Sequence, residues 1–188
     1  MARKAASKRS YPWNTTIKDK KVTIRLLNAN DKAALLNFAR SLPEEDLLFL
    51  SMDITTPQVV ERAIDNVSAG RFNVILAEMD GKLVGYANLI ISELTWVRHL
   101  GEIHLMISRE CRGFGLGSLL ADEVFAMAKN LGMQKIIARM AFDQRGAIQV
   151  FERLGFRAEA LLSDFVIDRN DRTHDLLVMS HDVRGLTE

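Results

Sequence analysis

Residues 112–117 read Arg-Gly-Phe-Gly-Leu-Gly and lie between an apolar, strand-like segment and an amphipathic helix. Three alternate glycines remove side chains where the chain turns, so the backbone can approach a ligand closely. The N–H groups of this turn lie at a helix N-terminus, where the helix dipole favours an anion. The run therefore predicts a phosphate or pyrophosphate site, with a purely structural turn as the alternative.

The spacing of the glycines does not fit two common phosphate-binding loops. A P-loop has lysine and then serine or threonine after its last glycine, whereas Ser118 follows Gly117 directly. A dinucleotide fingerprint reads G-x-G-x-x-G and has an acidic residue at a strand end about 20 residues later. Here the glycines read G-x-G-x-G, and no such acidic residue is present. We therefore expect a phosphate ligand of another class.

The hydrophobic pattern predicts strands and helices that alternate along one domain. Strands are expected over 22–26, 72–79, 83–93, 101–108, 135–140, 157–167 and 172–182, and helices over 30–42, 56–69, 115–131 and 146–154. Hairpins together with one β-α-β crossover indicate an α/β (α+β) fold. We expect a three-layer α/β/α sandwich around a mixed, mostly antiparallel sheet of about seven strands.

Length and charge are those of an ordinary globular protein. The chain has 188 residues, 48% of them hydrophobic, a net charge of +1, and a single cysteine that excludes an intramolecular disulfide. Residues 1–21 carry seven lysines and arginines against one aspartate. We expect them to form a flexible basic tail before a domain over 22–188, either as a solvated terminus or, less favoured, as an arm for nucleic acid. No apolar run approaches the ~20 residues of a membrane span, so we expect no membrane partner and a cytoplasmic location.

Two motifs together resemble those of the GNAT N-acetyltransferase superfamily. Residues 112–117 match its Q/R-x-x-G-x-G/A loop, and residues 147–156 are similar to its second motif, N-x-x-A-x-x-L-Y-x-K-x-G-F. The element order also agrees, so the resemblance covers about residues 22–182. It implies an enzyme that transfers the acetyl group of acetyl-CoA to a primary amine of a small molecule, an amino acid or a protein. Direct attack in a ternary complex is implied, and homodimers are common in the family.

The resemblance also implies which residues bind acetyl-CoA. The main chain of Met106 and Ile107 would bind the pantetheine arm, with the Ile107 N–H polarising the thioester carbonyl. The strands over 101–108 and 135–141 would splay to admit the thioester. The pyrophosphate would bind the loop amides of Gly113, Phe114, Gly115, Leu116, Gly117 and Ser118. We expect Arg112 to hydrogen-bond a phosphate, with stabilisation of the loop as the alternative.

Two positions of the second motif depart from the family pattern. Gln144 replaces an asparagine and keeps the amide group, one methylene further out. Phe151 replaces a tyrosine whose hydroxyl protonates the leaving thiolate in many members, and phenylalanine has no such donor. The second departure supports an alternative function, a non-catalytic acyl-CoA-binding sensor or interaction module.

A base is needed because a protonated amine is not a nucleophile. Glu102 and His104 precede the loop and are two residues apart in a predicted strand, so they share a face and are the catalytic candidates. The alternative is a surface carboxylate and a packed histidine. Cys111 adjoins Arg112 but has no recognisable histidine partner, so we do not expect it to be a nucleophile. No metal is expected, because His99, His174 and His181 lack metal-ligand spacing.

The acceptor pocket is less determined by the sequence. Glu93, Trp96 and Arg98 precede the cofactor strand and are candidates for its lining, with a simple loop as the alternative. Asp164 and Asp175 in the terminal hairpin either attract an amine or are turn-side charges. We expect residues 43–57 and the helix after them to determine which acceptor is used.

Overall fold

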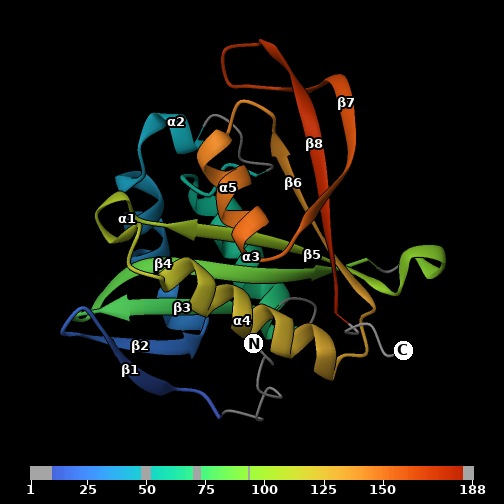
Figure 1. Ribbon diagram of the computed structural model, residues 1–188. Coiled ribbons are helices and arrows are strands. Elements are labelled where there is room, and N and C mark those ends of the chain that lie inside the picture. The colour runs from blue at the N-terminus through green and yellow to red at the C-terminus, as the bar shows by residue number, and fades with distance from the viewer. Residues whose placement is uncertain (1–9, 48–51, 70–72, 93, 184–188) are drawn as a thin grey trace.

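The computed structural model describes residues 10–47, 52–69, 73–92 and 94–183, and its strands form one mixed sheet (Figure 1). The strand order is β1-β2-β3-β4-β5-β6-β8-β7, and β5 with β6 is the one parallel pair in this described sheet. The strands are β1 (Trp13–Ile17), β2 (Lys20–Leu26), β3 (Asn73–Met79), β4 (Lys82–Ile91), β5 (Leu100–Ile107), β6 (Lys135–Ala141), β7 (Arg157–Ile167) and β8 (Thr173–Asp182). The α-helices are α1 (Lys32–Ser41), α2 (Glu44–Leu47), α3 (Pro57–Ser68), α4 (Leu116–Asn130) and α5 (Arg145–Arg153), and the 3₁₀ turns are η1 (Ala29–Asp31), η2 (Thr95–Val97) and η3 (Arg109–Cys111).

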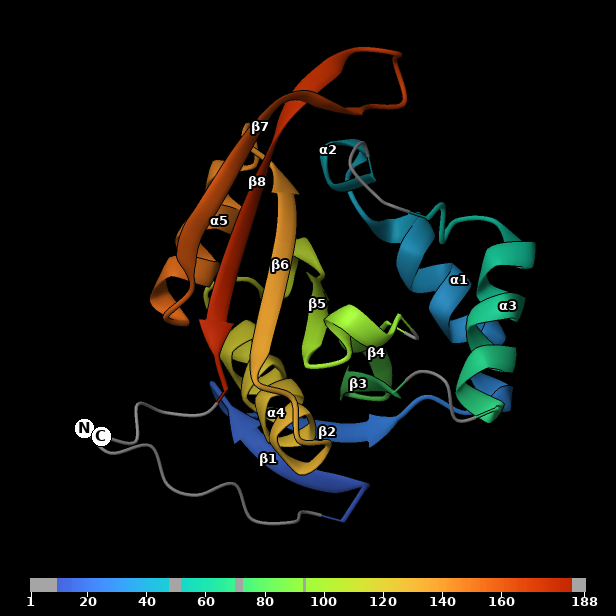
Figure 2. The same cartoon turned by 90° about the vertical axis from the view of Figure 1, so that its right-hand side faces the viewer.

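Strand β3 shows how the three layers are held together. Its successive side chains alternate between two hydrophobic clusters, so that Val74 and Leu76 pack with α1 and α3. Ile75 and Ala77 pack in the larger cluster on the opposite face, which includes residues of α4 and α5. A strand covered on both faces has a continuous apolar run, and in β3 this run is Val74–Ala77. In Figure 2, α1 and α3 lie on one side of the sheet and α5 on the other, which confirms the predicted three layers.

The N-terminal boundary that we predicted is wrong, because the sheet has an eighth strand. Residues 13–17 form β1, which pairs antiparallel with β2 through a two-residue turn at Lys18 and Asp19. Both turn residues have positive φ, 46° and 63°, as a type I′ hairpin requires. The basic composition of residues 1–21 obscured the alternation of half-buried and exposed residues in β1. The tail prediction for residues 1–9 lies outside the described residues.

The two parallel strands separate as predicted. β5 pairs with β6 only at Leu100–Lys135, Gly101–Ile136 and Glu102–Ile137. Beyond Glu102, β5 continues to pair with β4, while β6 continues to pair with β8. The sheet is therefore forked from Ile103 onward, and the fork opens toward the glycine-rich loop. Among the described residues, no helix combines the length and the apolar character needed to cross a bilayer.

Candidate functional site

The glycine-rich loop connects η3 to α4 and has the backbone that its sequence predicts. Gly113 and Gly115 have φ of 74° and 83°, in the left-handed region that favours glycine. A Cβ at either position would meet no atom within 4 Å, so glycine is needed there for its backbone conformation rather than for space. Gly115 is the N-cap of α4, and its carbonyl accepts the first helical hydrogen bond from Leu119. The N–H groups of the next residues lack intrahelical acceptors and can bind an anion.

Leu116 anchors this loop, since its side chain is only 1% exposed and belongs to the core. It can therefore offer a ligand only its main chain, as the resemblance implies. Ser118 is exposed in the first turn of α4, and Phe114 is half-buried. The loop thus presents backbone groups supported by one buried side chain.

Arg112 contacts protein groups, as the loop-stabilising alternative predicts, rather than being left free for a phosphate. Its Nε donates to the Ile107 carbonyl at 3.2 Å, and its Nη2 pairs with Asp46 of α2. Beside it, Arg109 lies 3.9 Å from Glu45 of the same helix. These contacts brace the loop against α2, a helix that the sequence analysis did not predict. They also occupy the carbonyl of Ile107, one of the predicted pantetheine ligands.

A cleft of about 510 Å³ begins at the fork between β5 and β6. Five of the predicted site residues line it: Glu102, His104, Met106, Gln144 and Phe151. Ile107 and residues 112–118 are not among its described lining residues, because they lie further along, where β5 ends and α4 begins. Further walls come from the α1–α3 layer and from the β7–β8 hairpin, and they are mostly apolar: Leu27, Leu35, Met52, Ile54, Val59, Ala63, Phe165, Val166 and Ile167.

Glu102 contacts a histidine and an arginine at the point where the strands part. Its Oε1 lies 3.1 Å from Nε2 of His104, and both of its oxygens accept from Arg139, at 2.9 and 2.5 Å. Burial alone would raise the pKa of Glu102, but the hydrogen bonds from His104 and Arg139 outweigh it and lower the pKa to about 2. Glu102 is therefore a carboxylate throughout the neutral range and a weak base, whereas His104 is the group that it orients.

The two departures from the family motif have structural roles. The Gln144 side chain accepts a hydrogen bond from the Ala141 N–H at 3.1 Å, which closes the turn between β6 and α5. The Phe151 ring is 7% exposed and packs edge-to-face against Phe156, with their centroids 5.0 Å apart. Phe151 is therefore both a core residue and part of the cleft wall.

The sequence analysis missed three polar residues of the cleft. Tyr86 and Asn88 extend from β4 and Arg139 from β6, and Asn88 pairs with His104 across the sheet. Asn88 Oδ1 is buried and accepts no hydrogen bond from the described residues. The Tyr86 ring packs edge-to-face on Phe38, and burial raises the pKa of its hydroxyl to about 12. Their alternation along a strand was visible in the sequence, but the strand register that brings them to the cleft was not.

Comparison with known proteins identifies the family. The sequence model of the acetyltransferase (GNAT) family matches residues 37–156, which include the loop, the fork and the whole of α5. The chain belongs to this family.

Individual relatives are distant, and they support the same fold. A putative phosphinothricin acetyltransferase of Bacillus subtilis is 29% identical over 82 residues, which are 44% of this chain and 50% of the relative. An uncharacterized N-acetyltransferase of Methanocaldococcus jannaschii is 30% identical over 98 residues, 51% of this chain and 60% of the relative. The chain thus matches only about half the length of these curated relatives. A putative acetyltransferase of Salmonella typhimurium, solved with its cofactor acetyl-CoA, superposes with a TM-score of 0.75 at 20% identity over 86% of this chain and 94% of that one.

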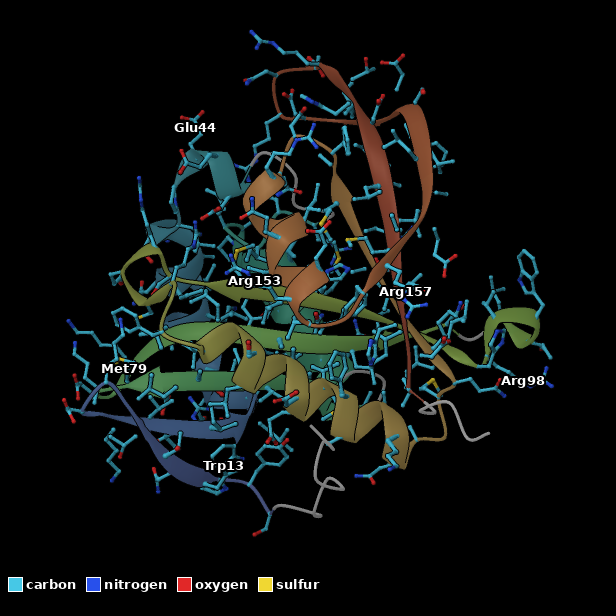
Figure 3. The ribbon with its side chains drawn as sticks, in the orientation of Figure 1. Trp13, Glu44, Met79, Arg98, Arg153 and Arg157 are labelled. Atoms are coloured by element: carbon cyan, nitrogen blue, oxygen red, sulfur yellow. The ribbon has the colours of Figure 1, made fainter. Side chains whose placement is uncertain are left out.

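Several further candidates do not form part of the cleft. Trp96 is 78% exposed in η2, and Arg98 donates to the Thr95 carbonyl at 2.7 Å. Figure 3 shows Arg98 on the β4–β5 connection, at the opposite end of the molecule from Glu44 of α2. Neither is among the described lining residues, so the prediction that they line the acceptor pocket is not supported. Glu93 lies outside the described residues.

The terminal hairpin uses its acidic residues in its own turns. Asp175 accepts a hydrogen bond from the Asp164 N–H at 3.0 Å, and Asp164 accepts one from the Thr173 hydroxyl at 2.8 Å. These are the turn-side charges of the alternative interpretation. Cys111 is 4% exposed and belongs to the core. Over the described part of the chain, no group of three or more histidine, cysteine, aspartate or glutamate residues is arranged to hold a metal ion.

Proposed function

We propose that this chain transfers the acetyl group of acetyl-CoA to a primary amine. The observation that carries the proposal is the fork between β5 and β6, which joins the glycine-rich loop at one end to a cleft with a histidine–carboxylate pair at the other. The loop amides suit a pyrophosphate, and the unpaired edge of β5 suits the pantetheine arm. Acetyl-CoA supplies the acetyl group as a thioester, and the amine enters from the cleft.

His104 is the proposed base, and Glu102 is a positioning residue. In a direct transfer a C–N bond forms, the C–S bond breaks, and the amine gives up a proton. Glu102 lies against His104 Nε2 and stays ionised because Arg139 also pairs with it, so it fixes the imidazole at the cleft wall. This division of roles replaces the expectation that either residue can take the proton.

Asn88 is the proposed anchor for the acceptor amine. Its buried carbonyl oxygen has no partner among the described residues, and a buried acceptor left unsatisfied is costly. An N–H of the bound amine would satisfy it, beside His104 on the same face of the sheet. This hydrogen bond would favour binding of the amine next to His104, the proposed base.

The leaving coenzyme A thiolate does not require a protein acid. Phe151 cannot donate a proton, but a free thiol has a pKa of about 8.5, so its thiolate is a tolerable leaving group near neutral pH. The Phe151 ring instead closes the cleft wall with Phe156. We therefore attribute to Phe151 the exclusion of water rather than acid catalysis.

The decisive experiment separates binding from turnover. The thermal midpoint is measured with acetyl-CoA and with ATP or NADH as controls, and thiol release is then followed with a panel of primary amines. A ligand at 100 times its dissociation constant stabilises by about 2.7 kcal/mol. Stabilisation by acetyl-CoA with amine-dependent thiol release supports the proposal. Stabilisation without release on any amine supports the acyl-CoA sensor, which Phe151 favours, and no stabilisation would contradict both.

A further inference from the structure

The β1–β2 hairpin ends beside the glycine-rich loop. Its turn consists of Lys18 and Asp19, and the Lys18 ammonium lies 3.9 Å from the centroid of the Phe114 ring. Phe114 stands between Gly113 and Gly115, the two residues whose left-handed backbone shapes the loop. The hairpin therefore holds a positive charge over the middle of the proposed pyrophosphate site.

Lysine is an unusual residue at this position of the turn. Lys18 has φ of 46°, and the first central position of a type I′ turn is normally asparagine, aspartate or glycine. Other L-residues carry a steric cost in this region, which asparagine tolerates and glycine avoids. Residues held in such conformations cluster at ligand sites, because the surrounding structure must over-determine them. The backbone thus points to a role for the side chain.

Each arginine of the loop has a carboxylate partner, whereas Lys18 has none among the described residues. Arg112 pairs with Asp46, and Arg109 lies against Glu45, both on α2. No described carboxylate pairs with Lys18, whose contact is the face of Phe114. A cation held on an aromatic ring keeps its N–H donors for an anion.

We propose that Lys18 binds a phosphate group at the nucleotide end of coenzyme A. This subsite comes from a hairpin outside the segment matched by the family model, residues 37–156, so family membership does not assign it. The inference rests on the proposed function, because it places coenzyme A in the loop. The pyrophosphate and the 3′-phosphate are both phosphate anions that an ammonium group can bind. A coenzyme A analogue without the 3′-phosphate distinguishes between them.

The test compares two single substitutions in the same hairpin. Lys18→Asn removes the charge and places a residue that suits the turn, so its thermal midpoint is expected to equal or exceed that of the wild type. Lys20→Gln removes one charge from the adjacent strand position and controls for the general field of the hairpin. Calorimetric titration then measures the Kd of coenzyme A and of 3′-dephospho-coenzyme A for all three proteins.

We expect Lys18→Asn to bind coenzyme A about 5 to 20 times more weakly, as for loss of a charge-assisted hydrogen bond, and Lys20→Gln to change it less than twofold. A loss confined to coenzyme A supports contact with the 3′-phosphate, and a loss with both ligands supports contact with the pyrophosphate. Wild-type affinity in Lys18→Asn, or equal losses in both variants, would overturn the inference alone. A wild-type protein that binds neither ligand would overturn the proposed function, and this inference with it.

Discussion

The carboxylate of Glu102, at the fork of the sheet, contacts both His104 and Arg139, and these contacts give the three residues different roles. Arg139 occupies both oxygens of Glu102, while His104 approaches one of them from the same strand. A carboxylate with a pKa of about 2 holds a proton poorly. The imidazole beside it can accept a proton and pass it to solvent, so the reactivity of the site should follow His104.

The first prediction concerns His104. Replacing it with alanine should lower kcat for acetyl transfer about 100-fold, the lower end of the range for general base catalysis, with little change in the Kd of acetyl-CoA. His99→Ala is the matched control, because His99 is exposed and lies outside the cleft. An unchanged kcat in His104→Ala would remove this residue from the mechanism.

The second prediction concerns Glu102 and the stability of the fold. Its folded pKa of about 2 lies below its ordinary value of 4.5, so its ionisation stabilises the folded state above pH 4.5, and that stability is lost as the pH falls toward 2. Glu102→Gln should therefore unfold at lower urea concentration than wild type at pH 7, and the difference should narrow below pH 4.5. A difference that stays constant from pH 7 to about pH 3 would contradict the assigned ion pairs.

At the scale of secondary-structure elements, a glycine-to-alanine substitution can be compared in the loop, where the backbone is left-handed, and in the helix α5. Gly115 has φ of 83° at the N-cap of α4, whereas Gly146 lies in the first turn of α5, and a Cβ would meet no atom within 4 Å at either site. Gly115→Ala should lower the free energy of unfolding by about 1 to 2 kcal/mol, because alanine is strained in the left-handed region. Gly146→Ala should raise it by about 0.4 to 1 kcal/mol. Urea denaturation measures both, and equal signs would refute the backbone argument.

A histidine fastens the β7–β8 hairpin to the turn that precedes α5. His174 of β8 lies 2.9 Å from Asp168 and 2.5 Å from Asp143, through its two ring nitrogens. The hydrogen bonds to Asp168 and then to Asp143 raise the pKa of His174 above its ordinary value of 6.5. Its contribution to stability is therefore full below pH 6.5 and is lost as the pH rises through the raised pKa.

His174→Asn should accordingly destabilise the protein most at about pH 6, and the difference from wild type should shrink toward about pH 9. The midpoint of urea unfolding at several pH values measures this, with His181→Asn as a histidine control on the same strand. His181 contacts the Gly155 carbonyl rather than a carboxylate, so its substitution removes a histidine from β8 without breaking the pairs with Asp168 and Asp143. If the destabilisation caused by His174→Asn increased with pH, the pKa of His174 would not be raised in the folded protein.

The sequence predicted the positions of helices and strands better than it predicted which elements pack or pair with one another. α3 begins at Pro57 after Thr56, and β7 spans Arg157–Ile167, as turn and cap signals indicated. β1 was missed because basic residues surround a short strand, and α2 because four residues show no periodicity. Arg139 entered the site through the pairing of β5 with β6, which depends on register, and a single sequence does not determine register.

For the molecule as a whole, the cleft lies between parts of the chain that are distant in sequence. Its walls come from the α1–α3 layer and from the β7–β8 hairpin, which the sheet brings to opposite sides of the fork. The net charge of the chain does not indicate which charged groups line the cleft. Among the described lining residues, the carboxylates are Asp46 and Glu102, and each is paired with an arginine. The other walls of the cleft are mostly apolar.

The last prediction follows from the apolar walls and the paired carboxylates of the cleft, and it compares two acceptors of the same length. Hexylamine and 1,5-diaminopentane differ only at the far end, where one has a methyl group and the other an ammonium group. Burial of a methyl group against the apolar walls is worth about 0.8 kcal/mol, whereas a second ammonium group would be desolvated without a carboxylate partner. We expect kcat/KM for hexylamine to be about tenfold higher, measured by thiol release at constant ionic strength. The Phe165 side chain is 61% exposed on the cleft wall, so Phe165→Asp should leave the protein folded. It should lower or reverse the preference for hexylamine, because it places a carboxylate near the second ammonium group. A preference of the wild type for the diamine would mean that an unpaired acidic group, not the apolar walls, selects the acceptor.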